Sequence, residues 1–489
     1  MKRLISFLLL LSLLLGVSAC GGKDSGGAPD DGPETTAATE AETTAEPSYL
    51  ASLPTEDYGG RDFSILCRDY KEYEIYSEQE TGDVMDDAIY RRNLAVAEKY
   101  NINVKSITSP GDWADQNTFT ALVKNSVMAG DDAYQCVAGY QAYIVPMAMD
   151  NCFVDLYDVS TLNPDNVWWT KGFVDNNRVD GRLYFISGDW SLTMWEYIYA
   201  CFFNKLLAEN YGVDDLYSVV RDGGWTWDYA DTQIKKVTGD LDGDGKYTNA
   251  DLYGWITNNH SCRCLLTTGG LPIVENTGDS LTLALFSDKF VQYYTKMYDI
   301  IYSGGNEVFF SRPSIDADYT EMMNIFTQDH ALFMTGTLDN TATLRSMETD
   351  FGILPFPKRD DTQAEYRSQV YDGQSVFCVP LSVSDIPFCG AIIEAMCAES
   401  KQSVIPDFYE TVLKSKVSRD NESSEMLDLI RETLWFDFGY VHSVSINYIF
   451  SFMGDNLKNN TKDIASLWEK NAKVYQKNLD KVVEAYFGE

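Results

Sequence analysis

Histidine is scarce in this sequence, and the motifs of several common enzyme classes are missing from it. No His-Glu-x-x-His segment occurs, Gly245-Lys246 lacks the spacing of a phosphate-binding loop, and the segment from Gly373 to Phe377 lacks the last glycine of a nucleophile elbow. The 489 residues therefore give no support to zinc hydrolase, P-loop or serine hydrolase chemistry. The histidines of the chain are His260, His330 and His442.

Basic residues are also few, since 38 Lys and Arg stand against 74 Asp and Glu and give a net charge of −36. This imbalance argues against nucleic acids and anionic membrane surfaces as partners, and a solvated acidic surface accounts for it. Aromatic residues are plentiful at 13%, with 31 Tyr, 24 Phe and 10 Trp. Tyr and Trp suit surfaces that must be both apolar and hydrogen-bonding.

The N-terminus has the pattern of an export signal. Two basic residues precede an apolar run from Leu4 to Leu15, which is too short to span a bilayer as a permanent helix. Residues 1–19 are therefore predicted to be a signal peptide. Val17-Ser18-Ala19-Cys20 resembles a lipobox, which implies a diacylglycerol on the Cys20 sulfur and a chain anchored by lipid to the extracytoplasmic face of the cell membrane. The alternative is an ordinary signal peptide followed by a chance cysteine.

The segment after Cys20 cannot bury a core. From Gly21 to Ser48 it contains no Val, Ile, Leu, Met or aromatic residue. Residues 20–57 are therefore predicted to be a lipidated cysteine and a disordered tether. About 430 residues follow, which is enough for a large core and two domains.

Nine cysteines remain besides Cys20, and an odd number cannot all pair. Most lie in apolar runs, where a cysteine behaves as a small hydrophobic residue. Cys262-Arg263-Cys264 is the one close pair, and without a second pair the sequence does not favour a zinc site. The nine are Cys67, Cys136, Cys152, Cys201, Cys262, Cys264, Cys378, Cys389 and Cys397.

After the tether, strand patterns alternate with helix patterns, which is typical of an α/β domain with a largely parallel sheet. In such sheets ligands bind beyond the carboxyl ends of the strands. Arg68, Asp69, Gly139 and Tyr140 fall at such ends. The expected elements are a strand over Phe63–Cys67, a helix over Asp83–Tyr100, a strand over Asn101–Ile107, a helix over Trp113–Ala129 and a strand over Tyr134–Ala138.

Two later helices are predicted from apolar residues at helical spacing. Ser287 is expected to cap a helix whose buried stripe is Phe290, Tyr293, Tyr294, Met297 and Ile301. The tail from Asp463 to Phe487 is expected to form one or two amphipathic helices. Its inward residues are expected to be Ile464, Leu467, Trp468, Val474 and Tyr475.

Several segments, in their order and spacing, resemble the family 1 extracellular solute-binding proteins. They are Gly181–Asp189, Cys201–Lys205, Trp225–Asp228, Asp240–Gly254, Ala331–Gly336 and Phe351–Pro357. The resemblance implies an α/β fold of two discontinuous lobes, joined by crossing strands that act as a hinge. We expect crossings near Tyr184–Trp190 and Tyr371–Val379. The expected boundaries are 58–187 and 371–430 for lobe 1, and 188–370 and 431–489 for lobe 2.

The resemblance also implies a function. It implies a receptor, not an enzyme, that captures a carbohydrate between its lobes and delivers it to the permease subunits of an ABC importer; we expect a monomer. Where maltose-type receptors carry a tryptophan after the glycine of the Ala331–Gly336 motif, this chain has Thr337-Leu338-Asp339. One stacking surface of that subgroup is therefore absent, and a peptide, a polyamine or a modified sugar stays open as the solute.

A sugar offers flat C–H faces and a rim of hydroxyl groups, so its receptor needs aromatic rings and planar polar groups. Trp190 is the strongest stacking candidate because it lies beside the first expected crossing, although a large aromatic residue is more often core. Arg68 and Asp69 are expected to bind hydroxyl groups or, alternatively, to form a surface ion pair. The predicted ligand-binding residues are Arg68, Asp69, Tyr140, Tyr143, Asp189, Trp190, Trp195, Glu196, Tyr371, Asp372 and Trp435.

The segment Asp240–Asp251 matches the spacing of a calcium-binding loop. Carboxylates stand at loop positions 1, 3 and 5, and Gly245 follows at position 6 for the sharp turn. Asp251 closes the loop where many EF-hands have glutamate, as in dockerin-type loops. A plain Asp-Gly-rich turn is the alternative. The predicted ligands of one structural calcium ion are Asp240, Asp242, Asp244, the backbone carbonyl of Lys246, Thr248 and Asp251.

Two other functional classes stay open. A secreted carbohydrate-active enzyme such as a glycoside hydrolase needs paired carboxylates, but 74 acidic residues make candidate pairs uninformative. A calcium-dependent adhesin or scaffold module is suggested by the Asp240–Asp251 loop. A single such loop argues against it.

Overall fold

The computed structural model describes residues 48–311, 315–417 and 420–488 of the chain. The predicted signal peptide, Cys20 and most of the predicted tether lie outside these residues. All described residues belong to one compact unit. None of the helices in these three ranges is long and apolar enough to cross a membrane.

The folded body begins earlier than predicted. Helix α1 (Tyr49–Ser52) packs on α14 (Ile386–Glu399), and its Leu50 is buried. The predicted end of the tether at residue 57 is therefore wrong. Tyr49 and Leu50 supply the apolar surface that the preceding residues lack.

Lobe 1 is built on a four-stranded sheet in the order β11-β3-β1-β2. β1 pairs in parallel with β2 and with β3, and β11 joins antiparallel to β3. Arg68 ends β1 and Tyr140 ends β3, so both lie at the carboxyl edge of the sheet. The strands are β1 (Arg61–Arg68), β2 (Ile102–Ser109), β3 (Cys136–Tyr140) and β11 (Ser375–Cys378). The helices of this lobe are α2 (Val84–Tyr100), α3 (Gln116–Ala129), α4 (Gln141–Met149), α5 (Lys171–Asn177) and α14, with a 3-10 turn η1 (Asp69–Glu74) after β1 and another, η2 (Trp113–Asp115), before α3.

The predicted alternation of strands and helices in lobe 1 is confirmed, and local signals explain it. Asp83 caps α2 by accepting hydrogen bonds from the backbone N–H groups of Met85 and Asp86. Asn101 then ends the helix in the left-handed conformation, at φ 49°.

Lobe 2 is built on a five-stranded sheet in the order β10-β4-β9-β5-β8. β5 runs parallel to β8 and β9, whereas β4 is antiparallel to β9 and β10. The strands are β4 (Tyr199–Asn204), β5 (Tyr253–Asn258), β8 (Val308–Ser311), β9 (Ala331–Thr337) and β10 (Phe351–Leu354), beside a small ribbon of β6 (Val274–Asn276) and β7 (Leu281–Leu283). The helices are α7 (Lys205–Asn210), α8 (Leu216–Arg221), α9 (Trp227–Ile234), α10 (Leu265–Thr268), α11 (Asp288–Tyr302), α12 (Ile315–Thr327), α13 (Thr341–Leu344), α15 (Asn421–Glu432), α16 (Phe438–Val441), α17 (Phe452–Lys458) and α18 (Ile464–Phe487).

The two helices predicted for this lobe are present. Ser287 caps α11 through the Phe290 N–H, and the whole predicted stripe of α11 is buried. The tail forms the single helix α18. Val474 was predicted to face inward but is 43% exposed, because the buried stripe of α18 passes through Tyr475, Leu479 and Val482 instead.

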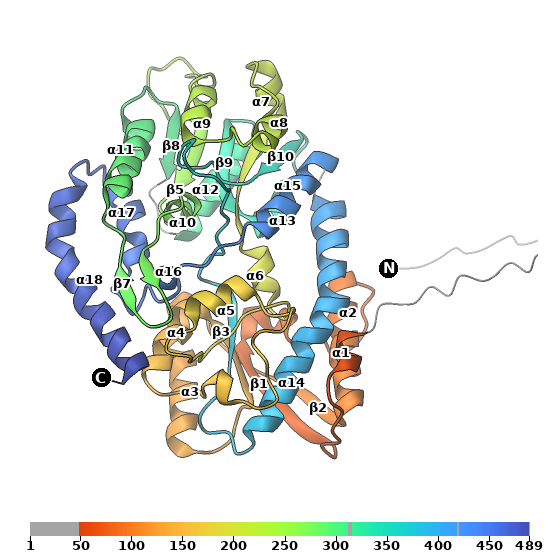
Figure 1. The fold of residues 1–489 in the computed structure, drawn as a ribbon. Helices are drawn as coiled ribbons and strands as arrows, with labels where there is room; N and C mark the ends of the chain where they lie inside the picture. The colour runs from red at the N-terminus through yellow and green to blue at the C-terminus, as the bar shows by residue number, and fades with distance from the viewer. Residues whose placement is uncertain (1–47, 312–314, 418–419, 489) are drawn as a thin grey trace, which may run out of the picture. The chain divides into compact units, whose positions relative to one another are not determined.

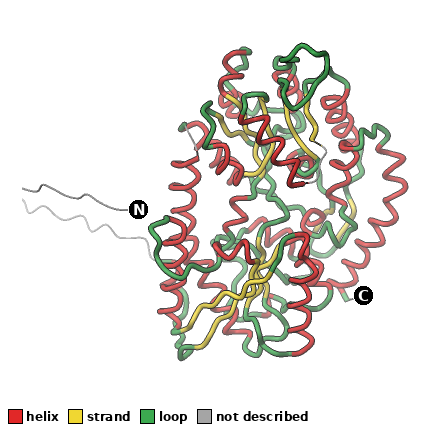
Figure 2. Tube along the Cα trace, turned by 180° about the vertical axis from the view of Figure 1, so that it is seen from behind, coloured by secondary structure: helices red, strands yellow, loops and turns green. Residues whose placement is uncertain are grey.

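Two stretches of chain cross between the sheets and touch each other. Ile186 bridges Phe377, and Ile198 bridges Val370, which is antiparallel pairing of the first crossing with the second. The short helix α6 (Leu192–Glu196) lies on the first crossing. Figures 1 and 2 show the two groups of strands with these connecting segments between them. The predicted fold of two discontinuous α/β lobes with a hinge of crossing strands is confirmed.

A third connection is helical. The chain continues from α14 into the π-helical segments η6 (Ser400–Val404) and η7 (Asp407–Val417), which pack on α2 of lobe 1. α15 then packs on β10 of lobe 2. The chain therefore returns to lobe 2 with α15, which begins at Asn421, and not at residue 431 as predicted.

All nine cysteines in the described part of the chain are buried and free. They act as small apolar side chains of the core, as their apolar neighbours in the sequence predicted.

Candidate ligand-binding cleft

A cavity of about 330 Å³ lies between the two lobes. It opens at the carboxyl ends of β3 and β5, because β3 ends at Tyr140 and β5 ends just before His260. This is the edge at which α/β sheets bind ligands. The lining residues are Trp113 and Tyr140 from lobe 1, His260, Arg263, Tyr448 and Phe450 from lobe 2, and Tyr371 and Asp372 from the second crossing.

Aromatic rings form much of this cavity. The hydroxyl groups of Tyr140 and Tyr371 share a hydrogen bond of 2.7 Å, which joins lobe 1 to the second crossing. The Trp113 ring lies 6.0 Å from that of Tyr140 and 6.3 Å from that of Tyr448, measured between centroids. Tyr448 is 45% exposed, so its ring is available to a ligand.

Three polar side chains of the cavity carry buried atoms without a hydrogen-bond partner among the described residues. They are Oδ1 of Asp372, Nε of Arg263 and Nδ1 of His260. A buried polar atom is costly to leave unpaired, so this trio favours a ligand that supplies both donors and acceptors.

Burial also sets the charge state of these groups. It raises the pKa of Asp372 to about 6, against the opposing effect of the Arg263 guanidinium. It lowers the pKa of His260 to about 2, with the Arg263 charge acting in the same direction, so the imidazole is neutral at pH 7. The cavity therefore offers one cation, one carboxylate that is largely ionised at pH 7 and one neutral imidazole.

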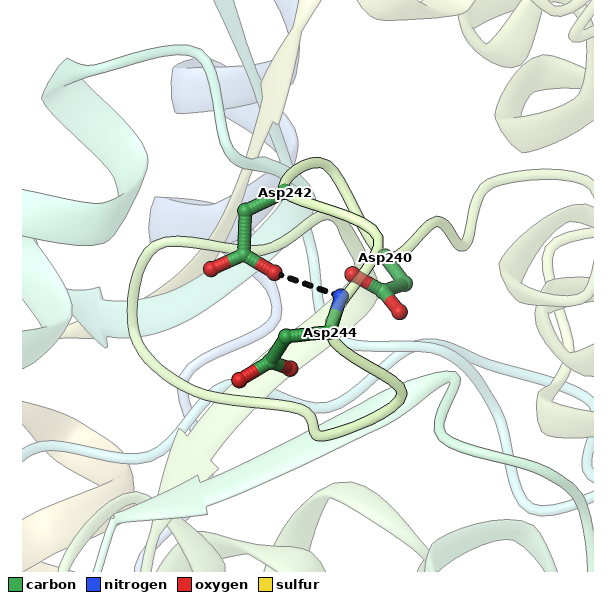
Figure 3. Close-up of side chains that lie close together, drawn as sticks. All are labelled: Asp240, Asp242 and Asp244. Atoms are coloured by element: carbon green, nitrogen blue, oxygen red, sulfur yellow. Dashed lines mark hydrogen bonds between the residues drawn. The ribbon is translucent and has the colours of Figure 1, made fainter.

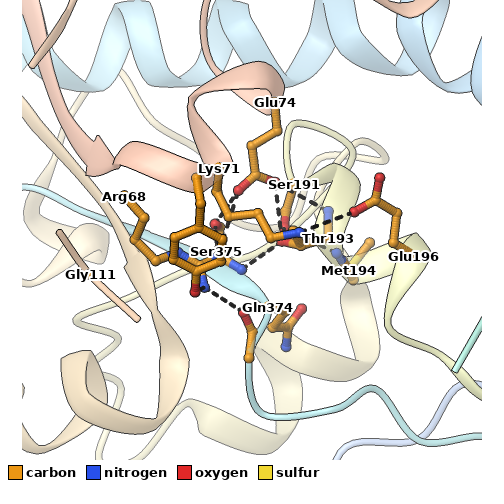
Figure 4. Close-up of polar contacts among 12 residues, drawn as sticks. Arg68, Lys71, Glu74, Gly111, Ser191, Thr193, Met194, Glu196, Gln374 and Ser375 are labelled. Atoms are coloured by element: carbon orange, nitrogen blue, oxygen red, sulfur yellow. Dashed lines mark hydrogen bonds and ion pairs between the residues drawn. The ribbon is translucent and has the colours of Figure 1, made fainter. Parts of the chain in front are cut away.

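Arg68, a predicted ligand residue, belongs to the hinge rather than to the cavity. Its guanidinium is buried and donates to the Gly373 carbonyl at 2.9 Å and to Ser375 Oγ at 2.7 Å. Its ion-pair partner is the buried carboxylate of Glu74, at 3.8 Å. Glu74 also accepts the backbone N–H of Thr193 in α6, at 3.1 Å (Figure 4). Arg68 and Glu74 thus bind β1 and η1 to both crossings.

Asp69 takes no part in that network. It is exposed at the start of η1, where its carboxylate accepts the Tyr70 N–H. The alternative prediction of a surface ion pair between Arg68 and Asp69 is also wrong, because Arg68 pairs with Glu74 in the interior.

Trp190 is fully buried and does not reach the cavity. Its indole stacks on Phe377 with ring centroids 4.2 Å apart and planes 5° from parallel. The Arg92 guanidinium lies 5.9 Å from the same ring. The prediction that Trp190 stacks on a sugar is wrong, because protein groups already cover its ring.

Two more predicted residues lie beside a different groove. Asp189 pairs with Lys401 at 3.2 Å, and the Arg431 guanidinium lies 4.7 Å from the Trp195 ring. Both line an open surface groove of about 280 Å³ that shares no residue with the interlobe cavity.

The last three predicted residues also have protein partners. Tyr143 donates to the Gly111 carbonyl at 2.7 Å within the core. Glu196 pairs with Lys71 at 3.7 Å (Figure 4) and accepts a hydrogen bond from Tyr73. The Arg367 guanidinium lies 4.3 Å from the centroid of the Trp435 ring. Of the predicted set, the structure brings Tyr140, Tyr371 and Asp372 together at the cavity.

Sequence reasoning missed five lining residues, and two of them carried a usable signal. His260 and Arg263 lie in the segment just after the end of β5 at Asn258, so the strand-end rule applied to lobe 1 would have found them in lobe 2. The other three are Trp113, Tyr448 and Phe450. These lie on turns whose direction no periodicity reveals.

The predicted calcium loop brings three carboxylates together. One oxygen from each of Asp240, Asp242 and Asp244 lies within 4.8 Å of the others (Figure 3). Asp240 also accepts the Gly245 N–H at 2.7 Å, which fixes the sharp turn. The pKa of Asp242 is raised: the Asp244 backbone N–H lowers it, but desolvation and the charges of Asp244 and Asp240 outweigh that bond.

Asp251 does not join these three carboxylates. Its oxygens accept the backbone N–H groups of Leu241 at 2.9 Å and of Thr248 at 2.7 Å. The donor set of the cluster suits a hard cation such as Ca²⁺, with Asp251 holding the loop closed from within.

No protein family model matches the sequence, and no curated protein matches it either. Solved structures do match in fold. The GacH receptor of Streptomyces glaucescens, which was determined unliganded and with acarbose, is 13% identical and covers 86% of this chain and 98% of its own, with a TM-score of 0.55. A cyclo/maltodextrin-binding protein complexed with maltotetraose is 10% identical, with coverages of 87% and 97% and a TM-score of 0.55.

A third match is UgpB from Mycobacterium tuberculosis in complex with glycerophosphocholine. It is 14% identical, with coverages of 87% of this chain and 99% of its own and a TM-score of 0.56. At such low identity these matches show the fold alone. The chain therefore has the two-lobed fold of the solute-binding proteins.

Proposed function

We propose that the protein is a receptor that captures a carbohydrate in the cavity between its lobes and delivers it unchanged to an ABC importer. The observation that carries the proposal is that two buried atoms inside an aromatic cavity, Arg263 Nε and Asp372 Oδ1, have no hydrogen-bond partner in the part of the chain that the structure describes. A guanidinium donates to hydroxyl oxygens and a carboxylate accepts from hydroxyl hydrogens, while Trp113 and Tyr448 offer flat surfaces to sugar C–H faces.

The fold supports the same proposal. The matched structures hold acarbose, maltotetraose or glycerophosphocholine, and each has the same two-lobed fold. The crossings that join Ile186 to Phe377 and Ile198 to Val370 provide a hinge about which two lobes can close. Binding, rather than chemistry, is the function that this arrangement favours.

We further propose that the chain is anchored through Cys20 to the outer face of the membrane, and that it works as a monomer. The apolar run and the lipobox pattern at the N-terminus support the anchor. We also propose one structural calcium ion held by Asp240, Asp242 and Asp244, because their carboxylates converge and a bound cation would offset the repulsion between them.

The test is a calorimetric titration of the purified protein against a panel of mono- and oligosaccharides, with a dipeptide, spermidine and glycerophosphocholine as non-sugar solutes. We expect a saccharide to bind with a micromolar dissociation constant, worth about −8 kcal/mol. Chromatography after incubation should recover it intact. Turnover would favour the enzyme interpretation, and exclusive binding of a non-sugar solute would replace the carbohydrate part of the proposal.

A further inference from the structure

Tyr448 has a backbone conformation that tyrosine rarely adopts. Its φ is 58° and its ψ is 37°, and the preceding Asn447 also has a φ of 58°. Asparagine tolerates this left-handed region, but a bulky side chain there is an outlier that persists only where the surroundings enforce it. Such strain is often found at ligand-binding positions.

Ser443 enforces this turn. Its carbonyl accepts the Tyr448 N–H at 2.7 Å, and its hydroxyl accepts the Phe450 N–H at 3.0 Å. Ser443 is itself buried, so the turn is held from inside the lobe. The turn thereby sets Tyr448 at the rim of the cavity and Phe450 in its wall, where the Arg263 guanidinium lies 4.6 Å from the Phe450 ring.

The strained residue also reaches the other lobe. The Tyr448 ring meets the Trp113 ring edge-on, with centroids 6.3 Å apart and planes at 82°. Tyr448 is nevertheless 45% exposed, so core packing does not explain why its ring is held there. Lobe 1 supplies Trp113 and lobe 2 supplies Tyr448, and both rings line the cavity.

We propose that Trp113 and Tyr448 close the mouth of the cavity as a pair and restrict the site to short ligands of one or two sugar rings. This inference rests on the proposed function. The cavity of about 330 Å³ is at the small end of the range for ligand pockets, which run from about 300 to 1,000 Å³. A longer chain has to extend through the mouth, where these two rings stand.

The strained turn can be tested without a ligand. We expect Tyr448→Gly to melt at a higher temperature than Tyr448→Ala, because glycine adopts φ near 58° freely and alanine does not. Asn151→Gly is the control for removing left-handed strain elsewhere, since Asn151 has φ 55° on the exposed surface and does not line the cavity. If Tyr448→Gly melts no higher than Tyr448→Ala, the turn is not strained in solution.

The size limit is tested with a ladder of α- and β-linked gluco-oligosaccharides of one to four rings, titrated by calorimetry. The unmutated protein and Asn151→Gly should bind a one- or two-ring member at least tenfold more tightly than the four-ring member. Tyr448→Ala should weaken the binding of the short ligand about tenfold. It should also reduce the difference in affinity between the short ligand and the four-ring ligand, because the mouth is then open.

Two results would overturn the size limit and leave the proposed function standing. One is tighter binding of the four-ring sugar by the unmutated protein. The other is a Tyr448→Ala variant that loses affinity equally for oligosaccharides of every length. Failure of the unmutated protein to bind any member of the ladder counts against both proposals, and the melting comparison then still decides whether the turn is strained.

Discussion

The indole of Trp190 stacks on the phenyl ring of Phe377, with centroids 4.2 Å apart and planes 5° from parallel. Trp190 lies on the first crossing just before α6 and Phe377 lies on β11, so the stack ties the two crossings together in the core of lobe 1. Its loss should therefore affect folding rather than binding.

We predict that Trp190→Ala lowers the free energy of unfolding by about 3 to 5 kcal/mol and leaves the affinity of the folded fraction for ligand nearly unchanged. Denaturant unfolding and calorimetry measure the two quantities. Trp113→Ala is the matched control. It should weaken ligand binding and leave the free energy of unfolding nearly unchanged, since Trp113 is partly exposed at the cavity. A Trp190→Ala variant of normal stability and poor affinity would restore the stacking interpretation.

Two buried aspartates should lower the free energy of unfolding as the pH rises from 5 to 7, whereas the buried His260 and His442, whose pKa values burial lowers, should raise it. Burial raises the pKa of Asp437 to about 7, although backbone N–H groups such as that of Ile273 oppose the shift, and burial raises that of Asp372 to about 6. Unfolded aspartate titrates near pH 3.9, so these two carboxyl groups bind more protons in the folded protein than in the unfolded chain between that pH and their folded pKa values. The stabilisation that these two protonated carboxyl groups provide is complete below about pH 3.9 and is lost as the pH rises through 6 and 7.

The measurement is the free energy of unfolding in urea at several pH values, for the unmutated protein and for Asp437→Asn. The variant cannot titrate at this position, so its free energy of unfolding should rise, relative to that of the unmutated protein, by about 1 kcal/mol per pH unit between pH 5 and 7. Parallel slopes for the two proteins would show that Asp437 is not protonated in the folded state.

The protein should fractionate with membranes if Cys20 is lipidated as proposed, because the acyl chains would then provide an apolar anchor. Cys20→Ser should release it into the soluble fraction with a smaller mass than the lipidated form. Cys67→Ser is the control that removes a buried core thiol instead. Continued membrane association of Cys20→Ser, with no difference in mass, would rule out lipidation.

Calcium should raise the melting temperature through the Asp240–Asp251 loop. At free calcium 100-fold above its dissociation constant, a site found only in the folded state adds about 2.7 kcal/mol. The double variant Asp240→Ala, Asp242→Ala should lose this response, whereas Asp69→Ala, which removes an exposed carboxylate elsewhere, should keep it. Equal melting temperatures of the unmutated protein in calcium and in chelator would disprove the site.

The sequence predicted the parts of the fold that local patterns specify. The strands and helices of lobe 1 were found because apolar periodicity and caps such as Asp83 act over a few residues. The direction in which the Trp190 side chain points depends on how the two crossings pair in the interior, and no local sequence pattern indicates that pairing. The same limit hid Tyr448, because its left-handed turn contains no glycine and is fixed by Ser443.

We propose that the cavity containing Arg263 and Asp372 is the ligand site. The most direct test is calorimetry of the tightest ligand from the panel with the unmutated protein, Asp372→Asn and Asp69→Asn. We predict that Asp372→Asn binds at least tenfold more weakly, because it loses a carboxylate whose buried Oδ1 has no partner within residues 48–311, 315–417 and 420–488 and can accept from the ligand. Asp69→Asn should bind as the unmutated protein does. Equal affinity of all three proteins would contradict the claim and place the ligand elsewhere.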